Sequence, residues 1–191
     1  VIPTKEDRTN VHLPAWRPGR YELGNFAKNV RNFKVLDSGS GALNFRKIDK
    51  DTWEVETAGC DEIVVSYNFY ASELNAGSTF ADKDQLYVNP VNCCVFTKES
   101  FNEPVEITLD ISSKWEVATS LELKDGKWHA ENTEELLDSP FIASGMLQRE
   151  SYESHGVTFH VWFNGIVKPD WERLIKDFQA FTDSQIAKFT E

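Results

Sequence analysis

Residues 61–72 read DEIVVSYNFYAS and carry the clearest strand pattern in the chain. Apolar side chains recur at every second position, which indicates a strand with one buried face. That face comprises Ile63, Val65, Tyr67, Phe69 and Ala71. Residues 105–111 and 157–163 alternate in the same way. Three separate stretches with a period of two predict a mainly β fold.

Shorter strand patterns occupy residues 41–48, 52–56 and 116–123, and glycine-containing turns separate them. The Asp125-Gly126 pair predicts a hairpin. Short strands at this spacing are typical of an antiparallel β-sandwich-like or open twisted-sheet domain, with about eight to ten strands.

Two segments break the alternation. Residues 21–30 are expected to form one turn of helix, and residues 169–191 a long amphipathic helix. The period changes near Lys168, which predicts a boundary there. Residues 1–167 would form a β-rich accessory domain, and residues 168–191 a helix leading into a further domain.

The composition limits the partners of the protein. The 191 residues have a formal net charge of -11, which disfavours nucleic acid and anionic membranes, because both require basic surface. The first ten residues resemble no signal peptide and lack an initiator Met, so we expect the natural start to lie upstream. The sequence leaves the cellular compartment open.

A search for chemistry finds no catalytic constellation. The four histidines, His12, His129, His155 and His160, do not form an H-E-x-x-H motif, and no C-x-x-C or G-x-S-x-G is present. Catalytic zinc needs three protein ligands, so we predict no catalytic residue, metal or cofactor within this chain.

Two weaker signals favour ordinary structure. Residues 82–93 lack the Gly and Glu of a calcium loop, which favours a solvated acidic loop. A single bridge from Cys60 is possible, but three free thiols are favoured, because the neighbours Cys93 and Cys94 would strain a mutual disulfide.

One block is specific to a family. Residues 13–30, LPAWRPGRYELGNFAKNV, resemble the signature near the start of the glycyl aminopeptidase family of zinc metallopeptidases (peptidase family sixty-one). DTWEV at residues 51–55, IVVSYNFYASEL at 63–74, WEVATSL at 115–121 and ELLDSPFIASG at 135–145 resemble later family blocks in the same order. The resemblance covers nearly the whole chain. Arg20 departs from it, because the family often has Ser there.

The resemblance implies a non-catalytic N-terminal domain of a zinc aminopeptidase that removes N-terminal Gly or Ala. The zinc would sit on an H-E-x-x-H helix in a following catalytic domain, which this sequence does not include. That domain would be the partner of this one, and peptide the substrate. The segment expected to face the cleft contains Tyr87, Asn89 and Asn92. A plain loop between strands is the alternative interpretation of that segment.

The last helix supplies a predicted docking face. Trp171, Phe178, Ile186 and Phe189 fall on one apolar arc. We expect them to dock on the catalytic domain, with Phe189 more exposed than Trp171 in this chain.

Tryptophans supply an alternative function, a carbohydrate- or peptide-binding β-sandwich. Trp16, Trp53, Trp128 and Trp162 could stack on a ligand. Core burial is the simpler expectation for them. In particular, we expect Trp16 and Tyr21 to be buried beside the Pro18-Gly19 corner. A family member that has lost its protease centre is a third possibility.

Overall fold

The computed structural model describes residues 1–189 and divides the chain into two compact units. The first unit consists of Val1–Asp110 and Thr119–Ile142. The second consists of Ile111–Ala118 and the chain from Ala143 onward.

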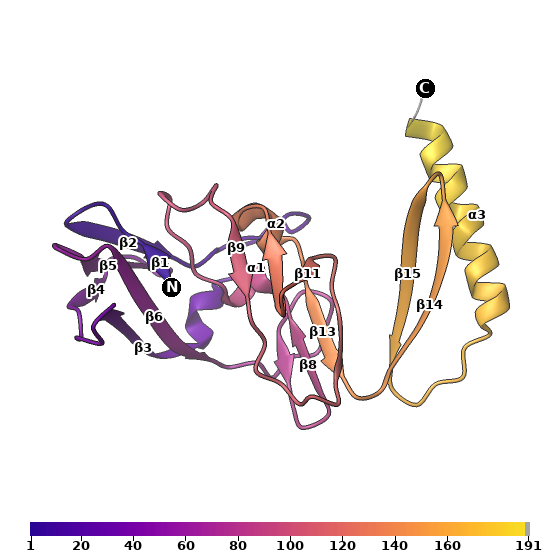
Figure 1. Ribbon diagram of the computed structural model, residues 1–191, viewed down its shortest axis with the longest axis horizontal. Helices are drawn as coiled ribbons and strands as arrows, with labels where there is room; N and C mark the ends of the chain where they lie inside the picture. Colours follow the sequence, from indigo (N-terminus) through magenta and orange to yellow (C-terminus); the bar gives the residue numbers. More distant parts are fainter. Residues whose placement is uncertain (190–191) are drawn as a thin grey trace. The chain divides into compact units, whose positions relative to one another are not determined.

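Two three-stranded antiparallel sheets begin the first unit (Figure 1). One has the order β1-β6-β3 and the other the order β2-β5-β4. The strands are β1 (Ile2–Pro3), β2 (Arg8–His12), β3 (Val30–Asp37), β4 (Phe45–Lys47), β5 (Thr52–Glu56) and β6 (Glu62–Phe69). A core cluster of buried residues draws on both sheets and contains Ile2, Val11, Val35, Val55 and Ile63. The alternation in residues 61–72 therefore buries one face, as predicted.

Aromatic side chains extend this core. Trp53 is 4% exposed, and its ring stacks on that of Phe33 with centroids 4.4 Å apart and planes 6° apart. Leu13, Phe26 and Ala27 pack in the same cluster as Trp53. The family-like block at residues 13–30 thus enters the core through Leu13 and through η1 (Phe26–Asn29), the short helix expected between residues 21 and 30.

The Pro18-Gly19 corner differs from its prediction. Trp16 is 48% exposed and Tyr21 is fully exposed, so the expected burial of both rings is wrong. Gly19 adopts φ 81°, and the indole N–H of Trp16 donates to the backbone carbonyl of Arg20 across the corner. This hydrogen bond holds the indole against the turn itself.

The rest of the first unit is built from short elements. β11 (Glu122–Lys124), β12 (Lys127–Ala130) and β9 (Val105–Ile107) form a sheet in the order β11-β12-β9. The β7 (Phe80–Ala81) and β8 (Gln85–Val88) strands form a hairpin. Two short helices follow in the chain, α1 (Pro90–Cys93) and α2 (Thr133–Leu137).

The second unit is a hairpin with a helix beside it (Figure 1). β14 (Leu147–Ser154) and β15 (Val157–Asn164) pair along their whole length. α3 (Trp171–Phe189) lies along them: Tyr152 Oη and Thr182 Oγ1 are 2.8 Å apart, and Gln179 Nε2 donates to the carbonyl of Glu153 at 2.9 Å. β10 (Glu116–Ala118) also belongs here, and β13 (Phe141–Ser144) crosses the division of the chain.

The predicted fold class is confirmed: the chain is mainly β, with antiparallel strands and a C-terminal helix. Residues 1–189 form more strands than predicted, because very short pieces such as β1 and β7 leave little trace in the sequence. The stretch 116–123 splits into β10 and β11, and β9 ends at Ile107 because its partner β12 reaches the turn at Asp125-Gly126. No helix in the described part of the chain is long and apolar enough to span a membrane.

Candidate functional site

Residues 75–79 form a loop that is tied down by side chains from elsewhere in the first unit. The carbonyl of Ala76 accepts from Tyr87 Oη at 3.2 Å and lies 3.5 Å from Arg17 Nη1. The carbonyl of Gly77 accepts from Asn92 Nδ2 at 2.8 Å. A Cβ on Gly77 would lie 2.1 Å from Arg17 Nη2, so only glycine lets the guanidinium pack this closely.

The three residues expected to face a cleft all contact this loop. Tyr87 and Asn92 bond to it as described, and Asn89 exchanges backbone hydrogen bonds with the hydroxyl of Thr79, at 3.2 Å from its N–H and 3.4 Å to its carbonyl. β8 delivers Tyr87, and the first turn of α1 delivers Asn92. Asn89 and Asn92 are buried and Tyr87 is half-buried.

An apolar groove of about 700 Å³ lies on the Ala76 side of the loop. The groove is lined by residues of the family-like block and by two of the predicted residues: Pro14, Trp16, Arg17, Pro18, Tyr87 and Asn89. Phe96, Phe101 and Leu137 supply further apolar wall, and Glu134 and Asp138 supply carboxylates. The groove therefore joins the family-like corner to two of the three predicted residues.

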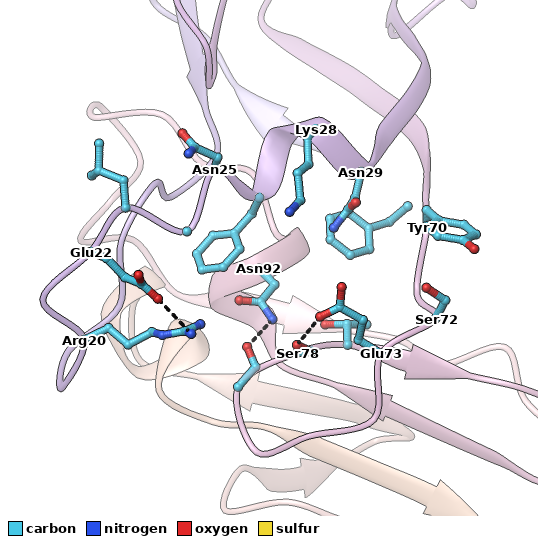
Figure 2. A pocket seen from close by; sticks show the side chains of 16 residues that line it. Arg20, Glu22, Asn25, Lys28, Asn29, Tyr70, Ser72, Glu73, Ser78 and Asn92 are labelled. Atoms are coloured by element: carbon cyan, nitrogen blue, oxygen red, sulfur yellow. Dashed lines mark hydrogen bonds and ion pairs between the residues drawn. The ribbon is translucent and has the colours of Figure 1, made fainter.

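A polar pocket of about 400 Å³ lies on the Gly77 side (Figure 2). Four charged side chains line it: Arg20, Glu22, Lys28 and Glu73. Arg20 Nη2 pairs with Glu22 Oε1 at 3.0 Å, and Ser78 Oγ donates to Glu73 Oε2 at 3.3 Å. Asn92 lines this pocket and not the groove, so the predicted residues do not converge on one hollow.

Asn92 is the most deeply buried side chain that lines the pocket, at 2% exposed, and its amide oxygen has no hydrogen-bond partner among the described residues. Exchanging the amide nitrogen and oxygen would set Oδ1 against the carbonyl of Gly77, so the orientation is fixed by that bond. The amide oxygen is therefore a buried acceptor that no described residue uses.

The buried titratable groups of the chain make hydrogen bonds within the fold. Burial raises the pKa of Tyr67 well above its ordinary value, and its hydroxyl donates to the carbonyl of Cys93. The three cysteines are free thiols, and the hydrogen bond between Cys93 and Cys94, with burial, raises the pKa of Cys94. Burial lowers the pKa of His12, whose Nδ1 lies 3.1 Å from Thr52 Oγ1. Residues 1–189 contain no group of three or more His, Cys, Asp or Glu side chains able to hold a metal ion.

The tryptophans considered for ligand stacking lie in different environments. Trp53 is core, Trp128 and Trp162 are half-buried, and Arg149 lies over the Trp162 ring at 5.2 Å from its centroid. Trp16 alone of these four is exposed, and it borders the apolar groove.

The predicted docking residues on α3 differ in their exposure. Trp171 is half-buried against Phe163, with ring centroids 5.2 Å apart, while Phe178 is exposed. Ile186 is half-buried, and Phe189 is 88% exposed. The expectation that Phe189 is more exposed than Trp171 is confirmed. Phe181 is a further exposed apolar side chain that the predicted arc omitted.

Comparisons with known proteins agree with the family-like blocks. The family described as the peptidase M61 N-terminal domain matches residues 1–145. The crystal structure of an aminopeptidase N family protein from Idiomarina loihiensis superposes with a TM-score of 0.90 at 26% identity. The match covers 100% of this chain and 33% of that protein, so the chain spans about a third of its length. No curated protein matches.

Proposed function

The chain belongs to the peptidase M61 N-terminal domain family, and from this we propose that it is the non-catalytic N-terminal domain of a zinc aminopeptidase. In this role it packs on a catalytic domain and walls one side of the peptide cleft. The zinc belongs to the catalytic domain. Residues 1–167 would be the accessory domain, and residues 168–191 the helix that leads into the catalytic one.

The apolar groove is the observation that carries the cleft role. It combines an exposed indole at Trp16, a phenol at Tyr87 and a guanidinium at Arg17 with the carboxylates of Glu134 and Asp138. Aromatic rings suit peptide side chains, and the charged groups suit peptide carbonyl and amino groups. A peptide could lie along this wall while chemistry took place on another domain.

Exposed apolar side chains on α3 support a docking role. Phe181 and Phe189 are exposed, and apolar surface of this kind is costly in water unless a partner covers it. A catalytic domain that follows in the chain would begin next to Phe189.

The exposed Trp16 keeps ligand binding by an independent module as the alternative. Trp53, Trp128 and Trp162 do not join it in an exposed row, which disfavours carbohydrate stacking and favours a peptide. A family member without a working protease centre would differ from our proposal only in the catalytic domain.

Two observations test the proposal. The coding sequence beyond Glu191 should encode an H-E-x-x-H helix. In the protein that carries this helix, Trp16→Ala and Tyr87→Phe should raise KM for tri- and tetrapeptides by about 5- to 10-fold, a change of about 1–1.4 kcal/mol. KM for a single-residue aryl amide should stay unchanged, because that substrate does not reach the groove.

The exposed Tyr21 does not line the groove, so Tyr21→Phe is the matched control and should leave every KM unchanged. Unaltered KM values for the longer peptides in both groove variants would remove the cleft role.

A further inference from the structure

The side-chain amide of Asn89 is an unused hydrogen-bonding group in the apolar groove. Asn89 is 8% exposed and stands just before α1, but its side chain makes no capping hydrogen bond there. The bonds that it exchanges with Thr79 use only its backbone. Its amide atoms have no partner within residues 1–189, yet neither is fully enclosed, in contrast to the oxygen of Asn92. Because Asn89 lines the groove, its amide is open to a ligand there.

A primary amide matches a peptide group. Its N–H donates and its oxygen accepts, so one Asn side chain can bond to both the C=O and the N–H of an extended peptide. The wall around Asn89 is apolar: the rings of Phe96 and Phe101 meet edge to face with centroids 5.3 Å apart, and the exposed Trp16 borders the same groove. A few polar groups in an apolar wall fix the orientation of a ligand.

Two carboxylates add a charge preference. Glu134 on α2 and Asp138 just after it lie one helical turn apart, and both are exposed and line the groove. Neither forms an ion pair within residues 1–189. Like charges at this spacing repel, so a cation that approaches both is stabilised. Arg17, the cationic side chain that lines the groove, packs instead on the 75–79 loop, with Nη1 3.5 Å from the Ala76 carbonyl.

We propose that the groove binds an extended peptide segment with a basic side chain, and that Asn89 holds its backbone. An apolar side chain of the peptide lies against Trp16 and Phe101, and a Lys or Arg side chain lies beside Glu134 and Asp138. The groove volume of about 700 Å³ is sufficient for a short segment. By naming the class of peptide, this proposal deepens the proposed cleft role and rests on it.

The test compares capped tripeptides that differ only in the charge of the central residue. Acetyl-Phe-Lys-Phe-amide and its glutamine and glutamate analogues are titrated into the 191-residue chain. Calorimetry measures the affinity, and the indole N–H resonance of Trp16, assigned with Trp16→Phe, reports the location. The lysine peptide should bind saturably, about tenfold more tightly than the glutamine peptide, and the glutamate peptide should bind most weakly. Salt at about 0.5 M should reduce the preference, because exposed charges are screened.

A double variant assigns the charge preference. Glu134→Gln combined with Asp138→Asn should abolish the preference for the lysine peptide and leave the affinity for the glutamine peptide unchanged. Glu62→Gln combined with Glu103→Gln removes the same charge from exposed residues outside the groove and should keep the preference.

Ester analogues assign the contact with Asn89. When each N–H of the lysine peptide is replaced in turn by an ester oxygen, one replacement should weaken binding to the wild type by about tenfold. The same replacement should have no effect in Asn89→Leu, which has no amide to accept that N–H. Asn89→Leu should unfold at the same denaturant concentration as the wild type, since the side chain makes no hydrogen bond within residues 1–189.

Equal affinity of the wild type for the lysine and glutamine peptides would overturn the proposal, as would a preference that survives in the Glu134 and Asp138 double variant. No saturable binding at millimolar concentrations, or ester effects that are the same in Asn89→Leu, would also overturn it. The cleft role fails by a separate result, unaltered KM values for longer peptides when Trp16 and Tyr87 are changed.

Discussion

Trp53 and Trp16 are the same residue type in opposite environments. Trp53 is 4% exposed and stacks on Phe33, whereas Trp16 is 48% exposed on the Pro18-Gly19 corner. Trp53→Ala should therefore destabilise the chain by about 3–5 kcal/mol, because it opens a cavity in the core. Trp16→Ala should cost less, about 1 kcal/mol, since about half of the side chain is already exposed to solvent and its removal opens no cavity in the core. Denaturant unfolding of both variants measures the difference, and equal costs would contradict it.

The buried phenol of Tyr67 should make the unfolding free energy depend on pH. Burial raises its pKa above the ordinary value of 10.0, and its hydroxyl donates to the carbonyl of Cys93. The folded chain keeps this proton while the unfolded chain loses it above pH 10. The contribution of Tyr67 to the unfolding free energy is therefore complete below about pH 10. It is lost as the pH rises further, by about 1.4 kcal/mol per pH unit.

The variant Tyr67→Phe isolates that effect. It should cost about 1–3 kcal/mol near neutral pH, because the Cys93 carbonyl loses its donor. It should also flatten the fall in unfolding free energy between about pH 10 and about pH 11. Tyr21→Phe, at an exposed ring, should keep the wild-type slope. Parallel pH curves for wild type and Tyr67→Phe would show that Tyr67 does not cause the fall.

At the level of elements, the tight hairpins depend on their turn residues. His155 and Gly156 adopt φ 51° and 79° between β14 and β15, the left-handed pair that a two-residue hairpin turn requires. A Cβ at Gly156 would meet no atom within 4 Å, so any cost of Gly156→Ala comes from the backbone alone.

That cost should be about 1–2 kcal/mol, the penalty of a left-handed residue other than glycine. Gly145→Ala in the same unit is the control, because its Cβ would make ordinary contact at 3.5 Å with Trp115 and its φ is not left-handed. It should change the unfolding free energy by less than about 0.5 kcal/mol. Thermal unfolding of the two variants checks the contrast, and a harmless Gly156→Ala would contradict the turn argument.

The sequence predicts elements well where their pattern is local. The alternation of residues 61–72, the Asp125-Gly126 hairpin and the amphipathic C-terminal helix all appear, because each depends on residues that are close in the chain. The predicted burial of Trp16 is wrong because the local sequence does not distinguish an indole that bonds to its own turn from one that packs in the core. The apolar groove and the polar pocket could not be predicted either. Arg17, Tyr87 and Asn92 are brought together only in the folded chain, where all three bond to the 75–79 loop.

For the whole molecule, family membership and fold agree, while the chain spans 33% of its aminopeptidase N family neighbour. The family match ends at residue 145, close to Ala143, where the second unit resumes. The predicted boundary near Lys168 remains a prediction about the longer protein. α3 packs along the β14–β15 hairpin through residues that include Thr182, and it leaves Phe189 exposed, which suits a helix shared between two domains.

The proposed division between this domain and a zinc-bearing catalytic domain gives the last prediction, which concerns this chain by itself. A catalytic zinc requires three protein ligands and an open position, and its chemistry depends on the water that it activates. The 191-residue chain should therefore hold less than stoichiometric zinc after dialysis and should not release Gly or Ala from peptides. Elemental analysis and an aminopeptidase assay measure both, with the protein extended through an H-E-x-x-H helix as the positive control. One zinc per chain together with turnover would mean that the catalytic centre lies here and that the proposed division of labour is wrong.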